Sequence, residues 1–226
     1  MQLYLVAYIL YINTLFNAIN LQKILHTNVL RFVKVSKGSG MCKEVFEIVQ
    51  KMDLSKVETR LALQCAPVIM GIKLSNLLII LSKDEKEVRR IFEGTGLIHY
   101  RLLRQKDRTI YLLFQKSKMD AHLKKKQVRQ LLAEKGYMDF SLVGILRTFQ
   151  LRYEDYINKK ADFPHEMGLL LGYPIEDVRG FIENNGKNYI YTGYWKVYAD
   201  LEEKKRIFDA YESAKEELII FLSKYL

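Results

Sequence analysis

Apolar and charged residues alternate in blocks from about position 41 to the C-terminus, and the spacing within each block predicts its secondary structure. Apolar positions three or four residues apart predict helices, whereas strict alternation or a short apolar run predicts a strand. The predicted helices cover residues 45–52, 55–65, 82–94, 120–136, 139–156, 164–171, 174–185 and 200–225. The predicted strands cover residues 68–72, 98–104, 109–115 and 189–198. This order predicts an α/β fold of the α+β type, with a small mixed sheet that contains a β-hairpin and is covered by several helices.

Capping residues and prolines set several of these boundaries. Ser55 with Glu58, and Ser82 with Glu85, match the capping box, in which the serine accepts from a free helix N–H and the glutamate reaches back. Pro67 lacks an N–H and is predicted to end the second helix, so that the apolar run 68–72 forms a buried strand. The predicted caps of later helices are Asp120, and Asp139 or Ser141.

The first forty residues differ from the rest. Residues 3–19 are almost all apolar and approach the roughly 20 residues that span a bilayer, but two asparagines interrupt them. They are also rich in residues that AT-rich codons encode. The short run before Met41 could be encoded by purine-rich codons that resemble a ribosome-binding site. We therefore predict a single globular domain over residues 41–226 and an N-terminal extension over 1–40. The extension is interpreted as upstream sequence before a true start at Met41, with a packing helix or a membrane anchor as the alternatives.

The net charge of +10 favours anionic partners, such as phosphate, nucleic acid or an acidic membrane. Much of the charge alternates in sign, however, as in residues 83–87 and 202–205, which is typical of solvated helix faces. The two cysteines, Cys42 and Cys65, form no metal-binding or disulfide pattern, so a cytoplasmic location is expected. The pattern identifies no cofactor and no metal site, and a membrane partner is not expected.

The first segment that is predicted to carry chemistry is 64–76. If 68–72 is a strand, Lys73, Ser75 and Asn76 lie where it leads into a helix, and free N–H groups beside an ammonium would bind an anion. The alternative is structural, with Ser75 as a helix cap and Lys73 as a surface charge.

The second segment is 163–177, in which His165 and Glu166 fall in a first helical turn. The helix dipole there disfavours an imidazolium, and a neutral histidine beside a carboxylate is suited to act as a base. One hypothesis is therefore an enzyme with Cys65 as nucleophile, His165 as base, Glu166 as its orienting group and Lys73 as anion clamp. The alternatives are an inert core cysteine and a packing or capping role for His165 and Glu166. Asp177 is a further ligand-binding candidate, with helix-dipole compensation as its alternative.

Two other functional classes stay open. Residues 189–198 are rich in aromatics, and exposed Tyr191 and Trp195 would stack nucleic-acid bases with Lys187 and Lys196 near the phosphates, although strand aromatics are first a sign of packing. A protein that acts only by interaction would instead expose an apolar patch around Phe221 on the last helix.

The residues quoted above also carry a resemblance. From about Met41 onward the sequence resembles a bacterial family catalogued as domain of unknown function 3793. The resemblance lies in Gln64-Cys65-Ala66-Pro67 with Gly71-Ile72-Lys73, in FPHEMGLLLGYPIEDVRGFIENNGKNY at 163–189, and in GYWKVY at 193–198. It implies an uncharacterised protein with no assigned activity. The function expected is therefore a small-ligand or anion pocket formed where the 64–76 and 163–177 segments meet, with the Cys/His enzyme and the nucleic-acid-binding module as alternatives.

Overall fold

The computed structural model describes residues 42–224, so the predictions for residues 1–40 lie outside the described residues. Its sheet consists of β1 (Ser75–Leu81), β2 (Leu97–Arg104) and β3 (Arg108–Gln115) in the order β1-β3-β2. The β2–β3 hairpin is confirmed, and both pairings in this sheet are antiparallel, so the sheet is not mixed. The α+β class is confirmed.

Opposite faces of the sheet pack against different helices, because successive strand residues point to opposite sides. Leu78 and Ile80 of β1 belong to a cluster with α4 (Val57–Ile69) and α5 (Glu85–Phe92), which follows the short 3₁₀ turn η1 (Ser82–Asp84). Leu77 and Ile79 face the larger cluster on the other side. The sheet is therefore the middle of three layers.

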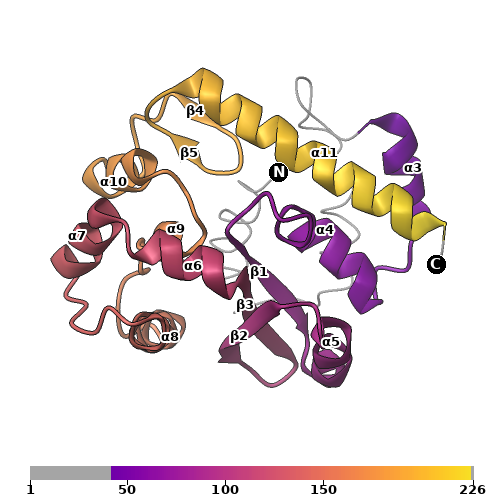
Figure 1. Ribbon diagram of the computed structural model, residues 1–226, viewed down its shortest axis with the longest axis horizontal. Coiled ribbons are helices and arrows are strands. Elements are labelled where there is room, and N and C mark those ends of the chain that lie inside the picture. Colours follow the sequence, from indigo (N-terminus) through magenta and orange to yellow (C-terminus); the bar gives the residue numbers. More distant parts are fainter. Residues whose placement is uncertain (1–41, 225–226) are drawn as a thin grey trace.

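The larger cluster is built by the chain that follows the sheet (Figure 1). Its helices are α6 (Lys116–Leu123), α7 (Lys126–Glu134), α8 (Leu142–Ile157), α9 (Met167–Leu170) and α10 (Ile175–Glu183). A small hairpin of β4 (Tyr191–Thr192) and β5 (Lys196–Val197) leads into the long α11 (Leu201–Ser223). Figure 1 shows α11 running back across the molecule to pack on α4 and on α3 (Lys43–Lys51).

The strand predicted at 68–72 is wrong. Pro67 lies inside α4, near its end, and the helix continues to Ile69 before Gly71 turns the chain with φ of +76°. A proline this close to a helix end forfeits one hydrogen bond, and its own carbonyl accepts from the N–H groups of Ile72 and Lys73. The strand begins only at Ser75, because a short apolar run does not distinguish a buried helix end from a strand.

Three predicted caps are wrong and one is confirmed. Ser82 Oγ donates to the Gln105 carbonyl at 3.3 Å and caps neither η1 nor α5, and Asp120 lies inside α6. Ser55 donates from its N–H and Oγ to Asp53 Oδ1 and does not cap α4. The prediction of one helix over 120–136 is also wrong, because α6 and α7 are separate helices. Ser141, by contrast, caps α8 by accepting from the Gly144 N–H at 3.0 Å. The single strand predicted over residues 189–198 is also wrong, because these residues form the β4–β5 hairpin. Between its strands, Gly193 lies so close to Phe208 of α11 that a Cβ there would overlap the ring.

Candidate functional site

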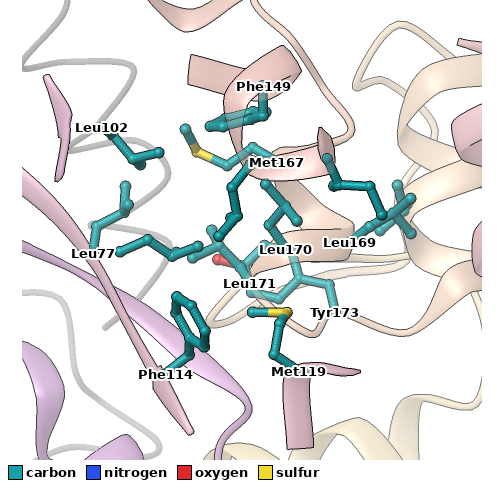
Figure 2. Packing of buried hydrophobic residues seen from close by; sticks show 14 of the residues in the cluster. Leu77, Leu102, Phe114, Met119, Phe149, Met167, Leu169, Leu170, Leu171 and Tyr173 are labelled. Atoms are coloured by element: carbon teal, nitrogen blue, oxygen red, sulfur yellow. The ribbon is translucent and has the colours of Figure 1, made fainter. Parts of the chain in front are cut away.

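The two segments singled out in the sequence pack against each other. Ser75 Oγ donates to the carbonyl of Leu170 at 2.5 Å, and an added Cβ on Gly172 would lie 2.6 Å from Leu74 Cβ. Figure 2 shows Leu170, Leu171 and Tyr173 packed with Leu77 and Phe114 of the sheet. The start of β1 and the chain around α9 therefore form one junction.

Lys73 is the unusual residue at this junction, because its side chain is buried with only 3% of the residue exposed. Its Nζ donates to Asn76 Oδ1 at 2.5 Å and lies 5.6 Å from the ring centroid of Tyr173 and 5.8 Å from that of Tyr211. Within residues 42–224, Lys73 has no ion pair with a carboxylate. The amine is thus held by one amide oxygen and two aromatic faces.

Burial sets the protonation state of this amine. Removal from water lowers the pKa of Lys73 well below its usual value, and the nearby Cys65 only partly opposes this effect. The Tyr173 ring lies beside this amine, and the Tyr173 hydroxyl is buried and has no hydrogen-bond partner in the described part of the chain. Burial also raises the pKa of Tyr173. The junction therefore holds an amine whose pKa is lowered and a phenol whose pKa is raised, and both have unused hydrogen-bonding capacity.

Cys65 lies on α4 in the cluster between that helix and the sheet. It is fully buried, and its Sγ donates to the Leu77 carbonyl at 3.6 Å. Burial raises the pKa of the thiol to about 12, against the smaller opposing effects of Asn76 and Lys73. A thiol in this setting stays protonated at neutral pH, which is unfavourable for a nucleophile.

His165 and Glu166 have other neighbours. The His165 ring lies 5.5 Å from that of Phe163 and 5.0 Å from that of Phe181, and burial lowers its pKa. Glu166 accepts from Arg152 Nη1 at 2.8 Å and from the Tyr137 hydroxyl at 3.1 Å. The rings that pack on His165 are not among the residues that cluster around Cys65. The Cys65–His165 pair stays a prediction, and Glu166 is engaged by partners other than the imidazole.

Thiol labelling distinguishes the hypothesis that Cys65 is inert from the hypothesis that it is a catalytic nucleophile. Because Cys42 is exposed and Cys65 is buried, we expect Ellman's reagent to react rapidly with one thiol in the native protein and with both after unfolding. A His165-activated Cys65 would instead react at neutral pH in the native Cys42→Ser variant, and the His165→Ala substitution would abolish that reaction. This second pattern would support the enzyme hypothesis over the inert cysteine.

The remaining ligand-binding candidates are used within the protein. Ser75 is bound to Leu170, and Asn76 bridges Lys73 and the carbonyl of Gln64. Asp177 is 1% exposed and accepts from the Trp195 indole N–H at 2.6 Å and from the backbone N–H groups of Tyr198 and Ala199 at 2.7 and 3.3 Å. Burial raises the pKa of Asp177 in spite of these donors. Its carboxylate thus fastens the β4–β5 hairpin to α10.

The aromatic hairpin is mostly a packing element. Trp195 is 4% exposed, stacks on Tyr173 with ring centroids 4.8 Å apart and meets Phe208 edge-on. Stacking on a nucleic-acid base needs an accessible ring face, which Trp195 does not offer. On α11, Ile220 and Phe221 are exposed and Leu222 is partly exposed, and the interaction hypothesis stays a prediction.

Two surface hollows lie away from the junction. One of about 460 Å³ is lined from α6, α7 and the start of α8, and one of about 450 Å³ lies beside the start of α6. Neither is lined by residues of 64–76 or 163–177. Within residues 42–224 no group of three His, Cys, Asp or Glu side chains is arranged to hold a metal ion, and no helix there is long and apolar enough to cross a membrane.

Sequence reasoning missed Tyr173 and Tyr211 as neighbours of Lys73. Tyr173 stands in the second segment, but its pairing with Lys73 depends on the contact between Leu74 and Gly172. Tyr211 comes from α11, and only its apolar spacing was visible. No local pattern marks either tyrosine as a partner of a lysine.

The fold and the junction define a small α+β protein with a buried lysine whose pKa is lowered by burial. The chain belongs to the family described as protein of unknown function (DUF3793), whose model matches residues 61–225. No curated protein and no solved structure matches the chain.

Proposed function

We propose that the protein binds a small anionic ligand at Lys73, at the junction of the 64–76 and 163–177 segments. The observation that carries this proposal is the buried Lys73 amine, which has an amide oxygen and two tyrosine rings around it and, among residues 42–224, no carboxylate in an ion pair with it. Burying an amine in this way is costly, and strongly perturbed ionisable groups gather at functional sites.

The surroundings of Lys73 suit one negative charge. The phenol of Tyr173 supplies a second donor beside the amine, and the amide of Asn76 orients the amine. At the surface of the same junction, Lys118 Nζ donates to the Gly71 carbonyl at 2.5 Å and adds a positive charge beside the 70–74 loop. A carboxylate or phosphate that displaced this loop would meet two cations and a phenol.

Binding of an anion would change the protonation of Lys73. In the free protein burial favours the neutral amine, whereas an adjacent anion favours the ammonium, so the pKa of Lys73 rises when the ligand binds. Binding therefore takes up a proton at any pH between the two pKa values. Within that window the affinity falls as pH rises, because each binding event must take up a proton; above both pKa values the amine is neutral in both states and the affinity no longer depends on pH.

Titration calorimetry with inorganic phosphate and with acetate tests this proposal. We expect saturable binding of at least one of them, with a heat that depends on the ionisation enthalpy of the buffer because a proton is taken up. The Lys73→Met variant should fold, since it places an apolar chain of similar length in a buried site, and should bind at least about tenfold more weakly. Lys187→Met, at an exposed lysine, is the matched control and should bind as the unchanged protein does. Absence of binding by both anions, or unchanged binding by Lys73→Met, would contradict the proposal.

Fewer structural observations support the alternative functions. The enzyme requires Cys65 and His165 to act together, and burial of the thiol disfavours its ionised form. The nucleic-acid module would need a surface other than the face of Trp195. We retain a cytoplasmic location as part of the proposal, because Cys42 and Cys65 are both free thiols.

A further inference from the structure

The outward face of α8 carries four exposed residues spaced four apart. The buried side chains of this helix are Ile145, Leu146, Phe149 and Tyr153, which pack in the core. With 100° per residue, the exposed set lies on the opposite side of the helix. Figure 1 shows α8 at the periphery of the fold. The exposed set is Val143, Arg147, Leu151 and Asp155.

This face combines apolar and charged groups in a fixed order. Val143 is 71% exposed and Leu151 56%, so two apolar side chains meet water on one helix. Neither Arg147 nor Asp155 has an ion pair within residues 42–224. They are eight positions apart, roughly 12 Å along the helix, and so do not neutralise each other.

We propose that this α8 face is the interface of a symmetric dimer of the chain. When two copies of α8 pair antiparallel around a twofold axis beside Leu151, position 147 of one helix falls opposite position 155 of the other. Arg147 of each copy then meets Asp155 of the second copy, which gives two ion pairs around a central pair of leucines. The central leucine and the two charges are thus complementary to themselves, whereas Val143 falls opposite position 159, beyond the end of α8.

The two opposite charges on the exposed face of α8 fit a second copy of the chain better than a membrane or a nucleic acid. An anionic membrane or a nucleic acid would attract Arg147 and repel Asp155, whereas an antiparallel copy matches both charges. One helix face is a small contact, so we expect a moderate affinity rather than an obligate dimer. This inference does not depend on ligand binding at Lys73.

Charge reversal tests the pairing directly. Sedimentation velocity over a micromolar-to-millimolar series should show a reversible monomer–dimer equilibrium. Arg147→Asp and Asp155→Arg should each raise the dissociation constant at least about tenfold, and the double variant should restore it, because it only exchanges the two partners. Arg206→Asp, at an exposed arginine of α11, is the control and should leave the equilibrium unchanged. A monomer throughout the series, or a double variant as weak as the singles, would overturn the proposal.

A cross-link tests the position of the axis. In a Cys42→Ser background, Leu151→Cys should form an intermolecular disulfide under mild oxidation, because the two copies of position 151 meet at the axis. Val143→Cys on the same helix should not, since its two copies lie on opposite sides of that axis. Equal cross-linking of both variants, or none by Leu151→Cys, would refute the arrangement.

Discussion

Replacing Gly172 with alanine should destabilise the protein by about 3 kcal/mol, whereas the same replacement at Gly94 should cost only about 1 kcal/mol. Both glycines have φ of +74°, so both substitutions incur the same backbone strain. They differ in their surroundings, because an added Cβ on Gly172 would lie 2.6 Å from Leu74 Cβ, whereas nothing lies within 4 Å of one on Gly94. The difference therefore isolates the contact between the two segments.

Urea unfolding followed by circular dichroism measures both changes. The Gly172→Ala variant should also weaken phosphate or acetate binding, since moving Leu74 moves the neighbouring Lys73. Equal losses of stability in the two variants would mean that the close approach of Gly172 to Leu74 is not present in solution.

Replacing Asp177 with alanine should destabilise the protein by about 3–5 kcal/mol. Its carboxylate accepts from the Trp195 indole and from the N–H groups of Tyr198 and Ala199, and the substitution would leave all three donors without this acceptor. Asp209→Ala, at an exposed position of α11, should change the free energy of unfolding by less than about 0.5 kcal/mol.

Tryptophan fluorescence gives an independent measure, because Trp195 is the only tryptophan. Release of its indole from Asp177 should alter the emission of the folded variant before the rest of the structure unfolds. A variant with unchanged stability and emission would show that the carboxylate does not fasten the hairpin.

The sequence pattern predicted those secondary-structure elements that depend only on residues close together in the chain. The β2–β3 hairpin follows from two alternating runs around a polar turn, and Ser141 caps α8 through its own side chain. The helix end predicted at Pro67 is wrong, because a proline near a helix end is tolerated when N–H groups of the following residues donate to the free carbonyls. That outcome depends on where α4 packs, which the sequence pattern does not contain.

The candidate site was predicted in part. The segments 64–76 and 163–177 were identified, and Lys73 is the residue that the structure makes unusual. The sequence, however, suggested a solvated ammonium at a strand end, whereas α11 and Tyr173 cover it and burial lowers its pKa. The role of Asp177 could likewise not be predicted from neighbouring residues, because its three donors come from the hairpin region some 20 positions away.

Burial lowers the pKa of Lys73 in the free protein, and we propose that a bound anion raises it. Nuclear magnetic resonance of lysine Cε and Nζ during a pH titration, with Lys73→Met to assign the signal, tests this claim most directly. We predict that the Lys73 signal titrates well below those of the exposed lysines, and that saturating phosphate or acetate moves its titration upwards. A Lys73 signal that titrates together with the exposed lysines, with and without anion, would contradict it.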